Sequence, residues 1–236
     1  MPGIECALRA VRPLRKSRRR YRRLLARIIL VALVTLPPAF LVDAEATILL
    51  KAAPAGVLRI LSTIGEWGDW PCLFCGGLVL FVVAAATRRL RMKRVVLCML
   101  LASCVGGLVT NGVKVVAGRT RPSFQAVPQG FYGPRLDGEW TFRNRGFASF
   151  PSSHSSTSAA FLGVLFFVRG WWPLVAALLL PLVPLARIST RSHHLSDVAA
   201  GIVIGVLSAG LVWYHLYPRL RVGAEKILRR RAKSAV

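Results

Sequence analysis

The sequence predicts an all-α fold: an integral-membrane six-helix bundle with an interfacial segment after the first span and an outer loop between spans three and four. Two observations carry this prediction. Hydrophobic residues make up 54% of the chain and its mean hydropathy is +0.53, which is unusual for a soluble domain. The apolar residues lie in long uniform runs and do not alternate with polar residues, which favours membrane helices over a barrel.

Six apolar runs are expected to cross the membrane, at residues 24–42, 71–87, 95–117, 155–168, 171–186 and 198–217. The fourth and fifth runs are shorter than the roughly 20 residues that cross a bilayer comfortably. A site recessed below the outer surface, at the ends of these two runs, would account for their shortness.

Three basic segments account for much of the formal net charge of +24. Ten Lys and Arg residues lie in 9–27, five in 88–94 and seven in 219–233. In a six-span chain all three segments face the same side, and the positive-inside rule makes that side the cytoplasm. The predicted domains are a basic cytoplasmic arm (1–23), a six-span membrane domain (24–218) and a basic cytoplasmic tail (219–236).

The positive charge is interpreted as a membrane anchor that also attracts anionic lipids. No sequence signature of a nucleic-acid-binding fold accompanies it, so nucleic acid is not an expected partner. The long basic region and the lack of a cleavage site predict that the first span is retained. Cys72 and Cys75 have no second cysteine pair, so neither a zinc site nor a disulfide framework is expected.

Two segments outside the spans have their own character. Residues 43–70 combine apolar positions at helical spacing with Pro54 and Gly56, which predicts a helix lying in the outer membrane interface. Residues 118–150 are rich in glycine, aromatic residues and arginine. They predict an ordered outer loop that forms a wall or lid over a site.

Three short motifs follow the ends of the apolar runs: Lys114-x6-Arg121-Pro122, then Pro151-Ser152-Ser153-His154, then Arg187-x5-His193-x3-Asp197. Counting spans from a cytoplasmic N-terminus places all three motifs on the extracytoplasmic face. Their three cations, two histidines and one carboxylate suit the cleavage of a phosphate ester without a metal or other cofactor.

Spacing assigns each motif a local role. Lys114 and Arg121 are about two helical turns apart and would share one face of a continuing helix. Ser152 is a candidate N-cap, and the turn at Ser152 and Ser153 would offer backbone N–H groups to a phosphate. Asp197 lies four residues after His193, so its carboxylate is expected to accept a hydrogen bond from that ring and fix its tautomer.

The motifs resemble the signature of the type 2 phosphatidic acid phosphatase superfamily, which reads Lys-x6-Arg-Pro, Pro-Ser-Gly-His and Ser-Arg-x5-His-x3-Asp. The resemblance covers about residues 107–197 and departs from the signature twice, with Ser153 in place of Gly and Ala186 in place of Ser. The run from His193 to Asp197 and the arginines of the outer loop are also similar to bacterial lipid A phosphatases.

The resemblance implies a role for each motif residue. His193 would attack phosphorus and form a phosphohistidine, oriented by Asp197. His154 would protonate the leaving oxygen and then activate water. The phosphoryl oxygens would be bound by Lys114, Arg121 and Arg187, with Ser152 and Ser153 at the helix start. His194 and the arginines of the outer loop receive no role.

The sequence therefore predicts a lipid phosphatase of the bacterial-type cytoplasmic (inner) membrane, with an extracytoplasmic active site and a phosphate monoester or diphosphate as substrate. Candidate substrates are phosphatidic acid, phosphatidylglycerol phosphate, undecaprenyl diphosphate and the phosphates of lipid A. Two alternatives stay open: a lipid phosphotransferase that uses the same intermediate, and a non-catalytic anion-binding or transport protein. The sequence leaves the oligomeric state open.

Overall fold

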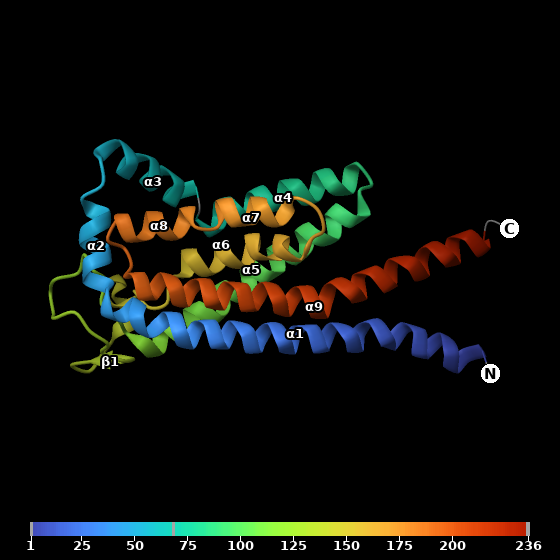
Figure 1. The fold of residues 1–236 in the computed structure, drawn as a ribbon, viewed down its shortest axis with the longest axis horizontal. Helices are drawn as coiled ribbons and strands as arrows, with labels where there is room; N and C mark the ends of the chain where they lie inside the picture. The colour runs from blue at the N-terminus through green and yellow to red at the C-terminus, as the bar shows by residue number, and fades with distance from the viewer. Residues whose placement is uncertain (1, 68, 235–236) are drawn as a thin grey trace.

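The structure is a computed structural model. It describes the backbone of residues 2–67 and 69–234, and the side chains of residues 17–49, 52–66 and 69–222. The long helices lie side by side along one axis (Figure 1). Their bounds are α1 Pro2–Leu41, α2 Asp43–Lys51, α3 Ala55–Trp67, α4 Trp70–Ala86, α5 Leu90–Ala117, α6 Ser153–Gly163, α7 Trp172–Leu179, α8 Leu182–Ser189 and α9 Leu195–Ser234.

Within the described residues, four helical segments are long and apolar enough to cross a membrane: Ser17–Leu41, Leu90–Ala117, Trp172–Ser189 and Leu195–Val222. A fifth candidate is α3 together with α4, which meet at an angle of 61° as a broken span or a re-entrant loop. The multi-span helical architecture is therefore confirmed, whereas the number of six spans stays a prediction. The fourth predicted span corresponds to α6 and the short 3-10 helix η3 (Val164–Phe167), which together fall short of the length of a full span.

The expected interfacial segment is divided between α2 and α3, and α3 packs against α8 (Figure 1). The basic arm and tail continue as the helical backbone of α1 and α9, and α9 runs through Pro218.

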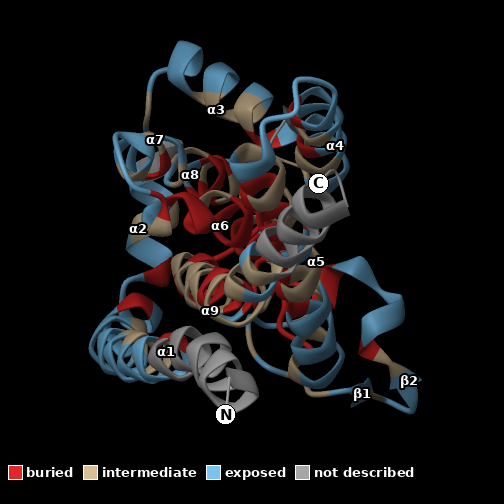
Figure 2. Ribbon diagram, turned by 90° about the vertical axis from the view of Figure 1, so that its right-hand side faces the viewer, coloured by how far each residue is buried: buried red, intermediate tan, exposed pale blue. Residues whose placement is uncertain are grey.

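Helix α6 lies at the centre of the bundle and is almost entirely buried (Figure 2). It packs between α5 and α9 through small residues. Added Cβ atoms at Gly201 and Gly205 would lie 2.5 Å from the carbonyl oxygens of Ser152 and Ser156, respectively. Glycine at these two positions lets α9 approach the backbone of α6 closely, as small residues do at membrane helix interfaces. This approach brings the first turns of α6 and α9 together.

The outer loop between α5 and α6 folds back onto the end of α5. Gly118 ends α5 with a φ of +54°, and its carbonyl oxygen accepts a hydrogen bond from the Tyr132 backbone N–H at 3.1 Å. The loop contains elements that were not predicted from the sequence: strands β1 (Arg135–Leu136) and β2 (Glu139–Trp140), and the 3-10 helices η1 (Thr141–Arg143) and η2 (Arg145–Phe147). The two strands pair antiparallel as a short hairpin.

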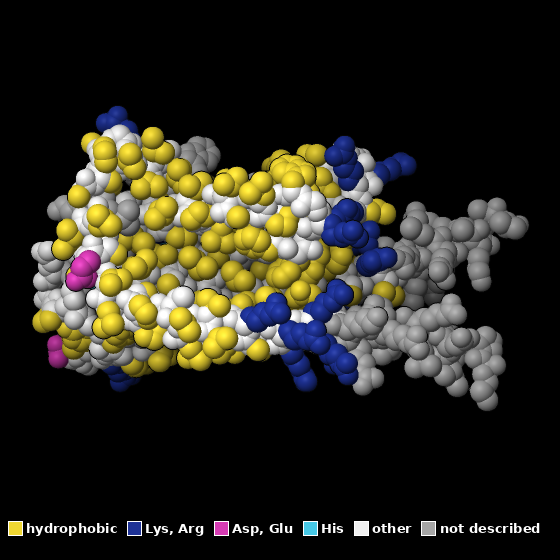
Figure 3. All heavy atoms as spheres, viewed as in Figure 1, with side chains coloured by type: hydrophobic (Ala, Val, Ile, Leu, Met, Phe, Trp, Pro, Cys, Tyr) yellow, Lys and Arg dark blue, Asp and Glu magenta, His cyan; other side chains and the backbone are white. Residues whose placement is uncertain are grey.

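The charged residues divide the bundle into two ends. Hydrophobic side chains cover its middle, and Lys and Arg side chains gather at the end that carries the α4–α5 turn and both termini (Figure 3). The first turns of α6 and α9 lie toward the opposite end (Figure 1). The three motifs are therefore separated from the basic segments by the length of the apolar middle.

Candidate active site

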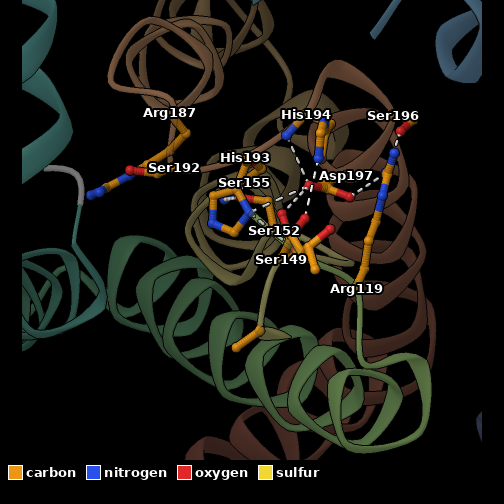
Figure 4. A network of polar contacts seen from close by, with 12 residues as sticks. Arg119, Ser149, Ser152, Ser155, Arg187, Ser192, His193, His194, Ser196 and Asp197 are labelled. Carbon is orange, nitrogen blue, oxygen red and sulfur yellow. Dashed lines mark hydrogen bonds and ion pairs between the residues drawn. The ribbon is translucent and has the colours of Figure 1, made fainter. Parts of the chain in front are cut away.

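The three motifs lie at the end of α5, the start and end of the outer loop, the start of α6, the end of α8 and the start of α9. Figure 4 shows residues of the second and third motifs together, and the charges of Lys114 and Arg121 from the first motif act on His193. The Ser152 backbone N–H donates to the Asp197 carbonyl oxygen at 3.0 Å, which joins the starts of α6 and α9. The His154 and His193 ring centroids lie 6.5 Å apart. The fold thus brings the two motif histidines to one site.

His193 is 1% exposed, and its ring is oriented by a backbone carbonyl. Its Nδ1 lies 2.8 Å from the Ser149 carbonyl oxygen, an acceptor, so Nδ1 carries the proton and Nε2 keeps its lone pair. The Asp197 carboxylate lies 3.8 Å from the same Nδ1, which is beyond hydrogen-bonding distance. The expected direct bond from His193 to Asp197 is therefore replaced by a bond to Ser149. Burial lowers the pKa of His193 to about 4, which favours the neutral ring.

Asp197 supports that geometry indirectly. Its carboxylate is fully buried and accepts hydrogen bonds from the Ser149 hydroxyl at 2.5 Å and from the His194 backbone N–H at 2.8 Å. The first bond fixes the residue whose carbonyl orients His193. The second satisfies an N–H at the start of α9, as the acidic residue of a capping box does. Asp197 thus holds the outer loop against the turn that carries His193, directly before α9.

A buried ion network that was not predicted from the sequence lies behind Asp197 (Figure 4). Arg119 is 7% exposed and donates to Asp197 at 2.6 Å, to Asp43 at 2.7 Å and to the Ser196 hydroxyl at 2.6 Å. Asp43 also accepts from the Ser196 backbone N–H at 2.8 Å. The guanidinium of Arg119 is therefore committed to two carboxylates. The sequence feature that could have indicated this network was the carboxylate of Asp43 directly after the first span. Residue spacing could not pair Asp43 with Arg119, because the two are 76 positions apart.

His154 is paired with a residue that was also missed. Its Nε2 contacts the carboxylate of Asp69, the N-cap residue of α4, whose side chain makes no capping bond. The His154 Nδ1 is buried without a hydrogen-bond partner. Burial, followed by the charge of Arg187, lowers the pKa of His154 to about 4, while Asp69 acts in the opposite direction. Asp69 is thus the carboxylate that faces the predicted general acid.

The predicted phosphate-binding cations surround the two histidines. Lys114 Nζ donates to the Ala148 carbonyl oxygen at 3.0 Å. Arg187 donates to the Gly65 carbonyl oxygen at 2.5 Å and lies 3.8 Å from Asp69. Burial, followed by the charges of Arg145 and Arg187, lowers the pKa of Arg121.

Among the side chains that the structure describes, three buried guanidinium Nε atoms have no hydrogen-bond partner, namely those of Arg121, Arg187 and Arg191. Arg191 is a further cation that the sequence interpretation left unassigned, although it lies four residues after Arg187. It donates to the Pro122 carbonyl oxygen at 3.2 Å. Unsatisfied donors among like charges are suited to an anion.

The serines at the start of α6 have distinct contacts. Ser152 is the predicted N-cap: its buried hydroxyl accepts from the Ser155 backbone N–H at 3.4 Å and lies 3.0 Å from the Ser155 hydroxyl. Ser153, which replaces the signature glycine, donates to the Asn111 side-chain oxygen at 3.2 Å.

His194 has structural contacts in this arrangement. Its Nε2 lies 3.2 Å from the Thr120 carbonyl oxygen, which ties the outer loop to the start of α9. Burial lowers the pKa of His194. Across the part of the chain that the structure describes, no group of three or more His, Cys, Asp and Glu residues is arranged to hold a metal ion.

Comparisons with known proteins identify relatives of this chain. The chain is 32% identical to lipid phosphate phosphatase 1 of Arabidopsis thaliana over 52% of its own length and 45% of that protein. It is 32% identical to the probable diacylglycerol pyrophosphate phosphatase 1 of Schizosaccharomyces pombe over 63% of each chain. The chain therefore spans about half to two thirds of the length of these relatives.

A solved structure shares the fold. The transmembrane PAP2-type phosphatidylglycerolphosphate phosphatase from Bacillus subtilis matches with a TM-score of 0.57 and 21% identity, covering 79% of this chain and 92% of that one. The sequence profile of the PAP2 superfamily matches residues 92–221, more than half of the chain, and this range includes all three motifs. The chain belongs to the PAP2 superfamily.

Proposed function

We propose that the protein is a membrane lipid phosphatase that hydrolyses a lipid phosphate monoester or diphosphate through a phosphohistidine intermediate at His193. The observation that carries this proposal is the tautomer of His193. The bond from Nδ1–H to the Ser149 carbonyl leaves the Nε2 lone pair available as a nucleophile, in a site surrounded by Lys114, Arg121 and Arg187. A neutral buried imidazole needs no base to remove a proton before it attacks.

In the first step, Nε2 of His193 forms a bond to phosphorus and the bond from phosphorus to the lipid oxygen breaks. His154 donates a proton to that leaving oxygen, a contribution of about 100- to 10,000-fold in rate. Burial and the charge of Arg187 lower the pKa of His154. A phosphoryl dianion placed beside the ring adds negative charge, which raises this pKa and favours the protonated acid.

In the second step, the now neutral His154 takes a proton from water while the water oxygen attacks phosphorus. The bond from phosphorus to nitrogen breaks, which releases phosphate and restores neutral His193. The three cations stabilise the charge on the phosphoryl oxygens in both steps. These positive charges belong to the protein, so the proposed reaction requires no metal.

The lipid nature of the substrate is supported by the names of the relatives, which act on lipid phosphates and on diacylglycerol pyrophosphate. The extracytoplasmic location is supported by charge. The basic side chains gather at the end of the bundle opposite the motifs (Figure 3), and the positive-inside rule assigns the basic end to the cytoplasm.

The test is phosphate release by the purified protein from phosphatidic acid, phosphatidylglycerol phosphate, diacylglycerol pyrophosphate, undecaprenyl diphosphate and lipid A. His193→Ala should abolish turnover and the covalent intermediate. His154→Ala should slow turnover by about 100-fold or more yet still allow phosphorylation of His193 by a substrate with a good leaving group. His215→Ala is the matched control: this histidine bonds to the Leu211 carbonyl within α9 and packs against Tyr21 of α1, and it is not one of the motif residues. Substantial turnover by His193→Ala would refute the mechanism, and transfer of phosphate to a second lipid in place of water would favour the phosphotransferase alternative.

A further inference from the structure

A cavity of about 380 Å³ opens beside His154 and extends from the candidate active site, because Asp69, Ser153 and His154 are among the residues that line it. It lies between the start of α4, the second half of α5 and the first turns of α6, and its lining includes Trp70, Cys104, Gly107, Leu108 and Thr157. Its volume is within the range of small-ligand sites in proteins.

The cavity follows the axis of α5. Cys104, Gly107, Leu108 and Asn111 are three and four residues apart and therefore share one face of the helix. The seven-residue step from Cys104 to Asn111 corresponds to roughly 10 Å along the axis. Asn111 lies at the end near the catalytic residues, and Cys104 lies about two turns toward the middle of the bundle. Glycine at position 107 leaves this face without a side chain where α5 passes Thr157.

The two ends of the cavity differ in chemistry. At the site end, Ser153 donates to Asn111 at 3.2 Å, and His154 contacts Asp69. Away from that end the lining is apolar, and Leu108 is 76% exposed on the outer surface of α5, within a candidate membrane span. The apolar part of the cavity is therefore continuous with the surface that faces lipid.

We propose that this cavity binds the hydrocarbon chain of the lipid alcohol that leaves during the reaction, a proposal that rests on the proposed function. His154 must reach the leaving oxygen, so the carbon atoms attached to that oxygen must occupy space next to His154. On the other side of the site, His193, Asp197 and Ser152 are buried and fully packed. The cavity along α5 is the adjoining space that suits an alkyl or isoprenoid chain, and it leads that chain to the bilayer.

Cys104 allows a test on the folded protein. The protein is treated with a long-chain alkyl methanethiosulfonate in a variant whose other four cysteines are alanine, and modification is measured by intact mass. Phosphate release is then compared for dioleoyl phosphatidic acid and for water-soluble para-nitrophenyl phosphate. We expect the ratio of kcat/KM for the lipid to that for the soluble ester to fall at least 10-fold. A variant with only Cys72, which is exposed on α4, is the matched control and should keep its ratio.

A second measurement uses the protein without chemical modification. The kcat/KM for monoalkyl phosphates should rise with chain length up to the length of the cavity and then level off. Gly107→Ala, which places a methyl group 3.2 Å from Thr157, should lower this dependence on chain length while phosphate release from the soluble ester continues.

An unchanged lipid preference after complete modification of Cys104 would overturn the cavity proposal and leave the proposed function intact. Equal loss of both activities would also overturn it, because the modification would then act on the catalytic residues. Failure of the unmodified protein to release phosphate from either substrate would instead refute the proposed function itself.

Discussion

Arg119 lies two residues before Arg121, yet the structure predicts opposite consequences when each is replaced. The Arg119 guanidinium is buried between the carboxylates of Asp43 and Asp197, at 2.7 and 2.6 Å. It also lies against the rings of Phe40 and Phe131, about 5 Å from each centroid. Arg119→Met keeps an apolar chain beside these rings and removes only the charge and its hydrogen bonds.

The loss should destabilise the protein strongly. Removal of one partner from a buried ion pair costs about 3–5 kcal/mol, because the remaining charge stays buried. Asp197 keeps its bonds to Ser149 and His194, and Asp43 keeps its bonds to Ser196, so the lower part of this range is expected. For a chain of this size, 3 kcal/mol corresponds to a decrease in Tm of roughly 6–12 °C, measurable by thermal unfolding in detergent.

The kinetic effect should appear in kcat more than in KM, because Asp197 and Ser149 orient the His193 ring and do not bind the phosphate. Asp43→Asn in the Arg119→Met background removes one unpaired carboxylate and should recover part of the lost stability. Arg121→Met is the comparison: it should lower kcat/KM and change Tm little. If Arg119→Met unfolds like the wild type and its defect lies in KM, Arg119 binds the substrate and the reasoning is wrong.

Three further predictions concern pH, metals and topology. Burial lowers the pKa of His193 from an ordinary value near 6.5 to about 4. The stability that depends on the neutral ring is therefore complete above pH 6.5 and is lost as pH falls through 4. Between pH 7 and 4 the Tm of the wild type should fall more than that of His193→Gln, and an equal decrease in both proteins would contradict the burial argument. Phosphate release should persist in EDTA. If EDTA abolished phosphate release and a divalent ion restored it, the metal-free mechanism would be wrong. Among single cysteines placed in a cysteine-free background, an impermeant reagent applied to intact cells should label position 129 and spare position 234, and the reverse pattern would move the active site to the cytoplasm.

Motif spacing alone identified the residues that meet at the site. Lys114, Arg121, His154, Arg187 and His193 were all expected near one end of the bundle, and the structure brings them close to one another, while their catalytic roles stay a prediction. Their common end could be predicted because a membrane restricts long helices to a common direction, so the position of a residue along an apolar run also gives its depth. The basic segments provided the second constraint, since they mark the opposite end of the same helices.

The partners of those residues depended on the tertiary structure. Residues four apart share a helical face, but the His193 ring turns to the Ser149 carbonyl because the outer loop brings that acceptor closer than Asp197. Asp43 and Asp69 contact Arg119 and His154 because of the way in which α2, α3 and α4 pack. No local sequence pattern predicts that packing.

The membrane-embedded helical class, the three motifs and their common end could thus be predicted before the structure was known, because hydropathy and spacing along a helix are local properties of the chain. The tertiary structure decided which of two neighbouring arginines is buried in an ion network, which carboxylate faces each histidine and where a cavity opens beside His154. The physical reason is that these contacts join residues 44 to 153 positions apart, and their distances are fixed by helix packing and loop return rather than by periodicity.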